Sequence, residues 1–186
     1  MVGANGPMIP EKNMHKIFDN FLEQDVFQNI QDIFFGNPGV PWYYEEKLHA
    51  QDTEINSYFY HILYGNVTDW RCNPRPNSEY FDLFLPLLHK MNCKSIINVR
   101  ANLYVKKNSL YKSLYHCDAF TDDLSHNTAI FYLNTCDGGT TLLIDEQEMV
   151  VRSVANRLCT FPASVKHKIG FQTDTDQRII ININYF

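Results

Sequence analysis

His116 and Asp118 have the residue types and the spacing of a metal site. An imidazole nitrogen and a carboxylate oxygen both bind divalent transition metals, and residues two apart at the end of a strand point to the same face. Such a pair is common by chance, so a third ligand is needed, and His167 lies beyond several strand-like segments. Two histidines and one carboxylate form the facial triad, which leaves three positions of an octahedral iron(II) open. The sequence therefore predicts an iron(II) site made by His116, Asp118 and His167.

Arg178 adds a second chemical group to this prediction. It opens the largely apolar segment 178–186, and an arginine that points inward in such a segment needs an opposite charge. The planar guanidinium suits the distal carboxylate of a dicarboxylic acid. Because the open iron(II) positions suit a bidentate 2-oxo acid and dioxygen, we interpret Arg178 as the partner of a dicarboxylic 2-oxo acid.

The remaining ligand-type residues are predicted to lie outside the metal site. His126 falls on the connection before a predicted strand, and we expect it at the surface. Cys117 should point to the face opposite the two ligands beside it. The other histidines lie in the N-terminal half and are expected to be packing or surface residues: His15, His49, His61 and His89.

The N-terminal half has mainly helical periodicity. Apolar residues recur at steps of three and four from Phe18 to Phe34, which predicts an amphipathic helix that residues 36–39 end. The aromatic residues of segment 41–44 are expected to pack in the core. A second helix is predicted over residues 77–91.

From Cys93 onward the period changes to two. Residues 97–105 alternate apolar side chains with Asn, Arg, Asn and Tyr, which predicts a strand with one apolar and one polar face. The polar face would line an interior that holds a ligand. Further strands are expected at 128–134, 140–144, 148–152, 156–161 and 178–186. Helices followed by many strands predict one α+β domain, mainly β, with residues 1–95 as helical support and 96–186 as a β core.

Composition excludes several other classes of protein. The 16 Lys and Arg residues against 21 Asp and Glu residues give a net charge of −5, which argues against broad binding of a nucleic-acid backbone. Since no run of about 18 apolar residues occurs, no transmembrane helix is expected. The five cysteines are odd in number and form no CxxC pair, as is typical of free thiols in a reducing compartment. We therefore expect a soluble, cytoplasmic protein.

Over residues 96–186 the chain resembles the prolyl 4-hydroxylase-like branch of the 2-oxoglutarate/Fe(II)-dependent oxygenases. It is also similar to small oxygenases encoded by bacteriophages, for which the location would be the host cytoplasm. One departure is that residues 107–115 lack the Gly-rich turn that often precedes the HxD motif in members acting on peptides. The resemblance rests on His116 and Asp118, the strand 130–134, the turn Gly138-Gly139, the segment 157–162, His167 and Arg178.

The resemblance implies a double-stranded β-helix (jelly-roll) core with the N-terminal helices packed on one sheet. It implies Fe(II) at the triad and 2-oxoglutarate as co-substrate, with ascorbate as a candidate reductant. Arg178 and Tyr132 would hold the distal carboxylate, and Tyr104 would face the pocket. The implied reaction couples decarboxylation of 2-oxoglutarate, to succinate and CO2, with hydroxylation of a peptidyl proline, another protein residue or a small molecule.

Two other functions stay open at this point. One is a cupin-like metal enzyme that does not use 2-oxoglutarate, and the other is an inactive metal-binding jelly-roll module. The polar residues Asn102 and Asn184 would either touch the substrate or satisfy buried backbone groups. Nucleic acid and membrane are not expected partners.

Overall fold

The computed structural model describes residues 15–48, 56–65, 74–109, 111–118 and 126–186. Short strands outnumber helices, as the alternating pattern of the second half requires. Along the chain the elements are β1 (Lys16–Phe18), α1 (Gln24–Phe35), β2 (Tyr43–Glu45), β3 (Tyr58–Gly65), β4 (Arg75–Pro76), a 3-10 helix η1 (Glu79–Phe84), α2 (Leu85–Lys90), β5 (Ile96–Val105), β6 (Asn127–Tyr132), β7 (Gly139–Ile144), β8 (Gln147–Arg152), β9 (Arg157–Pro162), β10 (His167–Gly170) and β11 (Gln177–Tyr185).

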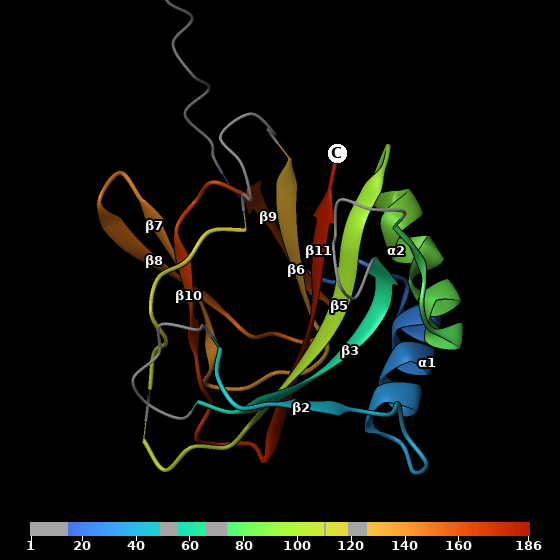
Figure 1. Ribbon diagram of the computed structural model, residues 1–186, viewed down its shortest axis with the longest axis horizontal. Coiled ribbons are helices and arrows are strands. Elements are labelled where there is room, and N and C mark those ends of the chain that lie inside the picture. Colours follow the sequence, from blue (N-terminus) through green and yellow to red (C-terminus); the bar gives the residue numbers. More distant parts are fainter. Residues whose placement is uncertain (1–14, 49–55, 66–73, 110, 119–125) are drawn as a thin grey trace, which may run out of the picture.

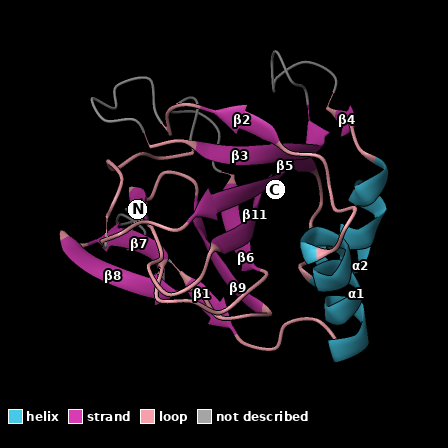
Figure 2. Ribbon diagram, turned by 90° about the horizontal axis from the view of Figure 1, so that it is seen from below, coloured by secondary structure: helices cyan, strands magenta, loops and turns pink. Residues whose placement is uncertain are grey.

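The strands form two antiparallel sheets that face each other. The large sheet has the order β1-β9-β6-β11-β5-β3-β2, with β4 beside β3, and the small sheet has the order β10-β7-β8. The helices α1 and α2 cover the face of the large sheet that points away from the small one (Figure 1). Figure 2 shows the same three layers from below. This arrangement confirms the predicted mainly β class with helices packed on one sheet.

The central strand β5 has the two faces that its alternation predicts. Val99, Ala101 and Leu103 are buried in the core between the large sheet and the helices. The intervening positions, from Asn98 to Tyr104, line a pocket between the two sheets. The five strands predicted after β5 are all present with ends shifted by one or two residues, whereas β10 was not predicted as a strand.

The first helix begins later than predicted. Residues 16–18 form β1, which pairs with β9, and α1 starts only at Gln24. Asn156, which directly precedes β9, holds the segment between them. Its carbonyl oxygen accepts from the Phe21 N–H and its side-chain oxygen accepts from the Leu22 N–H. These tertiary hydrogen bonds replace the helical ones that the apolar periodicity favours.

The N-terminal half also contains a long strand that was expected to belong to a helical region. β3 lies between β2 and β5 in the large sheet. Both of its faces are covered, so aromatic or aliphatic residues occupy nearly every position and no period of two is visible. The predicted helix over 77–91 is present, but its first half is the 3-10 helix η1.

The aromatic segment 41–44 is only partly in the core. Trp42 packs against Phe34 of α1, with ring centroids 6.1 Å apart. Tyr43 and Tyr44 each keep 59% of their surface exposed because β2 is an edge strand. Core packing was therefore the wrong prediction for these two tyrosines.

The cysteine and membrane predictions can be compared with the described part of the chain. Cys93, Cys117, Cys136 and Cys159 are free thiols. Cys72 and His49 lie outside the described residues. Among the described helices, none is long and apolar enough to cross a lipid bilayer.

The helix layer leads to a stability prediction. Phe84 is fully buried against Phe34 of α1, with ring centroids 5.6 Å apart, whereas the next residue, Leu85, is 47% exposed. Phe84→Ala should lower the free energy of unfolding by about 3–5 kcal/mol, because it opens a cavity in the core. Leu85→Ala, its matched control, should change it by about 0.5 kcal/mol or less. Urea unfolding of both variants measures this, and equal losses would contradict the described packing.

Candidate metal centre and its pocket

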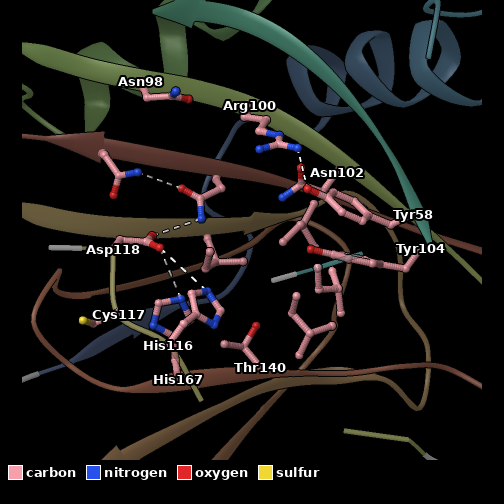
Figure 3. A pocket seen from close by; sticks show the side chains of 16 residues that line it. Tyr58, Asn98, Arg100, Asn102, Tyr104, His116, Cys117, Asp118, Thr140 and His167 are labelled. Atoms are coloured by element: carbon pink, nitrogen blue, oxygen red, sulfur yellow. Dashed lines mark hydrogen bonds and ion pairs between the residues drawn. The ribbon is translucent and has the colours of Figure 1, made fainter. Parts of the chain in front are cut away.

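A cavity of about 330 Å³ lies between the two sheets. One wall is the inner face of the large sheet, and the opposite wall comes from the small sheet and the segment 111–118 (Figure 3). The residues that matter for chemistry line both walls: Asn98, Arg100, Asn102 and Tyr104 on β5, Asn182 and Asn184 on β11, and His116, Asp118, Thr140 and His167 on the other side.

Backbone hydrogen bonds place the two histidines side by side. The His116 N–H donates to the His167 carbonyl over 2.9 Å, and the His167 N–H donates to the His116 carbonyl over 2.8 Å. Opposite residues of an antiparallel pair project to the same face. The two imidazole centroids are accordingly 4.2 Å apart. His116 was expected at the end of a strand, but it lies in an extended segment that meets β10 only through isolated bridges.

Asp118 completes the group. Its Oδ1 lies 3.8 Å from Nε2 of His116 and 3.8 Å from Nε2 of His167. The three ligand atoms all lie within 4.8 Å of one another. Cys117 lines the pocket, but its sulfur points away from the ligands beside it (Figure 3). The structure thus brings together the three residues that the sequence indicated, and no fourth joins them among the described residues.

Neighbouring groups orient two of the ligands. Nδ1 of His167 lies 3.0 Å from the Val165 carbonyl, which can only accept, so Nδ1 carries the proton and Nε2 is free to bind a metal. The second oxygen of Asp118, Oδ2, accepts from the Asn182 amide at 3.2 Å and lies 3.1 Å from the Thr128 hydroxyl, whose one proton it shares with Asn184 Oδ1 at 2.9 Å. Oδ1 is therefore the oxygen directed at the histidines.

Arg178 is completely buried behind the deep end of the pocket. Its Nη1 donates to the carbonyls of Gly139 and Gly170 on the small sheet, and its guanidinium carbon lies 4.9 Å from the ring centroid of Tyr104. Nε and Nη2, which form one edge of the guanidinium, have no hydrogen-bond partner in the part of the chain that the structure describes. A Cβ on Gly138 would lie 2.9 Å from the Gly170 carbonyl oxygen and 3.1 Å from Nη1 of Arg178, so this turn needs a glycine.

Two buried tyrosines flank this arginine. The Tyr132 hydroxyl donates to Thr140 Oγ1 at 2.9 Å, and Tyr104 lines the pocket itself. Burial raises the pKa of both phenols, although the charge of Arg178 opposes that shift. Both tyrosines therefore stay protonated at neutral pH and can act as hydrogen-bond donors. Tyr132 and Arg178 lie behind the residues that line the cavity.

His126 differs from its predicted surface position. It is only 2% exposed, and its ring lies 6.0 Å from that of the C-terminal Phe186. It is not part of the metal group. His61 packs in the interior, as one of the two expected alternatives, between the Pro41 carbonyl and the Ser78 hydroxyl.

Sequence reasoning did not identify the residues that orient Asp118. Thr128 lies on β6 and Asn182 on β11, and both reach Asp118 only after strand pairing. The alternation along the last strand could have predicted that Asn182 faces the pocket, because Asn182 lies on the same face as Asn184. Both Asn102 and Asn184, for which contact with a substrate was left open, line the pocket.

Glu148 ties the segment that carries His116 to the small sheet. Its carboxylate accepts hydrogen bonds from Lys168 at 2.5 Å, Tyr115 at 2.8 Å and Lys112 at 3.0 Å. These bonds, the one from Lys168 foremost, hold the pKa of Glu148 at about 2, below its ordinary value of 4.5.

Comparison with known proteins identifies similar solved structures. An oxidoreductase of the 2OG-Fe(II) oxygenase family from Burkholderia pseudomallei matches with a TM-score of 0.69 and 12% identity, over 92% of this chain and 85% of that chain. A Trichoplax adhaerens prolyl hydroxylase, solved with a peptide of the hypoxia inducible factor oxygen degradation domain, matches at 0.66 and 15%, over 94% and 84%. The epimerase SnoN, solved with Fe3+, alpha ketoglutarate and nogalamycin RO, matches at 0.61 and 12%, over 94% and 79%.

At the level of sequence, no family model and no curated protein matches the chain. The structural likenesses, at identities of 12–15%, show the fold. The chain has the double-stranded β-helix fold of the 2-oxoglutarate/Fe(II) oxygenases, as the resemblance in its second half implied.

The metal group gives a direct prediction. His116→Ala, Asp118→Ala and His167→Ala should each lose tight binding of iron(II), or of manganese(II) as a surrogate, because each removes one of three protein ligands. His89→Ala, at an exposed position on α2, is the control and should bind like the wild type. Anaerobic calorimetry measures the affinities, and unchanged binding in all three ligand variants would contradict the site.

The lowered pKa of Glu148 gives a pH prediction. A carboxyl whose pKa falls on folding contributes stability above its unfolded value of about 4.5, and this contribution disappears as the pH falls toward about 2. Glu148→Gln should therefore lower the melting temperature above pH 4.5 and have progressively less effect below it. The effect should be small and should weaken with salt, because the group is at the surface. Glu79→Gln is an exposed control, and a difference that does not change with pH would refute the role of this charge.

Proposed function

We propose that this protein is a non-haem iron(II) enzyme that uses 2-oxoglutarate and dioxygen to hydroxylate a primary substrate. His116, Asp118 and His167 would hold iron(II). Arg178 and Tyr132 would hold the distal carboxylate of 2-oxoglutarate, with Tyr104 beside it. Iron(II) bound there would supply activation of dioxygen coupled to oxidative decarboxylation of 2-oxoglutarate to succinate and CO2.

The chemistry of the donor atoms fits iron(II). Two neutral imidazoles and one carboxylate are the ligand set of non-haem iron(II) sites that keep open positions. Within the described residues no further His, Cys, Asp or Glu joins the group, so the protein would leave part of the coordination sphere free. The hydrogen bonds to Asp118 Oδ2 and His167 Nδ1 keep the ligand atoms aimed at one point.

The observation that carries the proposal is the unpaired edge of Arg178. A guanidinium that is 0% exposed, with neither Nε nor Nη2 hydrogen-bonded among the described residues, is costly unless an anion joins it. Nε and Nη2 lie on one side of the plane and match the two oxygens of a carboxylate. An arginine with only a structural role would donate from Nε and Nη2 to protein acceptors. The lack of such acceptors among the described residues therefore favours a dicarboxylic co-substrate as the partner.

The neighbouring side chains would assist binding in ways that their contacts define. The aromatic ring of Tyr104 lies against the guanidinium and screens it from water. Tyr132 donates its hydroxyl proton to Thr140, which leaves the Thr140 hydroxyl as a donor that suits a carboxylate oxygen. The molecules bound in the similar structures, a peptide in one and nogalamycin RO in another, are compatible with either a protein or a small-molecule substrate here.

Arg178 provides the test that separates this function from that of a metal enzyme without 2-oxoglutarate. Arg178→Ala should weaken binding of 2-oxoglutarate to the metal-loaded protein by roughly 30-fold or more, the loss typical of a buried charge pair that loses one partner. Arg178→Lys should weaken it moderately, because the ammonium keeps the charge but not the planar fork. Metal affinity should barely change in either variant, since Arg178 is not a ligand.

The measurement is anaerobic titration of 2-oxoglutarate, followed by the weak visible charge-transfer band of the iron(II) complex and by calorimetry. Arg75→Ala removes an exposed arginine on β4 and is the matched control. Wild-type affinity in Arg178→Ala, with metal binding intact, would refute the co-substrate assignment and leave a metal site of another kind.

A further inference from the structure

A second arginine, Arg100, lines the same pocket on the wall formed by β5. We propose that Arg100 binds an anionic group, a carboxylate or a phosphate, of the primary substrate. This inference rests on the proposed function, because it assigns the substrate class of that site.

The position of Arg100 suits a substrate. Along the inner face of β5, Asn98 and Arg100 are half-buried, whereas Asn102 and Tyr104 are buried, so the pocket deepens toward Tyr104. Arg178 lies opposite Tyr104 in the register of β5 and β11, at the closed end. Arg100 therefore lies on the more open part of the pocket wall, where the primary substrate can enter after 2-oxoglutarate has bound.

Arg100 is also close to the metal site through its strand neighbour. In the register of β5 and β11 it pairs with Asn182, whose amide donates to Oδ2 of the metal ligand Asp118 at 3.2 Å. Directly paired residues on one face of an antiparallel sheet have Cβ atoms about 5 Å apart. Arg100 lies across the pocket from His116 and His167 (Figure 3), so the rest of a molecule held by Arg100 would extend toward the metal ligands.

The guanidinium is held in place but not saturated. It lies over the ring of Tyr60, 4.1 Å from the centroid, and Nη2 donates to the Tyr58 hydroxyl over 2.5 Å. Its Nε is buried without a hydrogen-bond partner in the described part of the chain, as is Oδ1 of the adjacent Asn102. No carboxylate forms an ion pair with Arg100 among the described residues. A pre-oriented arginine with donors to spare is a typical anion site.

The charges of the proposed complex point to the same substrate class. Iron(II) and Arg178 together carry three positive charges, and 2-oxoglutarate and Asp118 together carry three negative charges. Arg100 is then the one charged group left uncompensated among the described residues that line the pocket. A neutral substrate would leave this partly desolvated charge without a partner, whereas an anionic one would neutralise it.

The test uses the full chain loaded with manganese(II) and N-oxalylglycine, a 2-oxoglutarate analogue that does not turn over. The probes are N-acetylglycine for a carboxylate, methyl phosphate for a phosphate and N-acetylglycinamide as the neutral match. Because manganese(II) is paramagnetic, broadening of the probe's methyl resonance reports both binding and proximity to the metal. We expect broadening with at least one anionic probe and none with the amide, and the probe that binds identifies the anion.

Arg100→Gln should weaken binding of that anionic probe by at least about 10-fold, the effect of losing a hydrogen bond to a charged group. Arg100→Lys should retain part of it, and Arg75→Gln, the exposed control on β4, should match the wild type. Tyr58→Phe keeps the aromatic wall but removes the hydroxyl that orients Nη2. It should weaken the probe less than Arg100→Gln does, and it serves as the second variant if Arg100→Gln does not fold.

Equal probe binding by wild type, Arg100→Gln and Tyr58→Phe, or no anion binding by the wild type, would overturn the inference. Titration of the co-substrate in the same variants separates the two proposals. If Arg100→Gln loses 2-oxoglutarate affinity, Arg100 is a co-substrate residue and the substrate assignment fails while the enzyme class stands. If the wild type binds metal but not 2-oxoglutarate, the proposed function fails, and anion binding measured without N-oxalylglycine still decides whether Arg100 recognises anions.

Discussion

The reciprocal backbone bridge between His116 and His167 is the interaction on which the site depends. The segment 111–118 forms no regular strand, so this bridge, the one between Lys112 and Gly170, and the hydrogen bonds from Lys112 and Tyr115 to Glu148 determine where His116 lies. The pair of hydrogen bonds places two imidazoles on one face and, through the spacing of two, brings Asp118 to the same point. Strand β10 thus supplies the ligand His167, and its pairing with the irregular segment 111–118 positions the ligands His116 and Asp118 beside it.

The second constraint is the cost of buried charge. The large sheet faces the apolar helix layer on one side and, on the other, a second apolar cluster and the cavity with the metal group, and both arginines project to this second side. Arg178 uses Nη1 to bind the carbonyls of Gly139 and Gly170, which joins the two sheets at their closed end. The group that joins the two sheets therefore leaves its other edge, Nε and Nη2, without a hydrogen-bond partner among the described residues.

Much of this could be predicted from local patterns, and the exceptions have physical causes. Alternation in β5 is visible because one face is apolar and the other polar, and the HxD spacing needs only an extended backbone. β3 was hidden because both of its faces are covered, which removes the alternation. The roles of Thr128 and Asn182 arise from strands far apart in the sequence that converge on Asp118, and His126 is buried with its ring beside that of Phe186. Such contacts depend on tertiary pairing, which local periodicity does not encode.

The alternation of β5 also has a consequence for how the protein can change. From Asn98 to Tyr104, the odd positions lie in the core that faces the helices and the even positions line the pocket. Point substitutions at even positions can reshape ligand preference while leaving the packing against the helices intact. A one-residue insertion or deletion would instead exchange the two faces, moving an arginine and a tyrosine into the apolar layer and valine, alanine and leucine into the cavity. Along this strand, the protein can therefore diverge through substitutions but not through insertions or deletions of single residues.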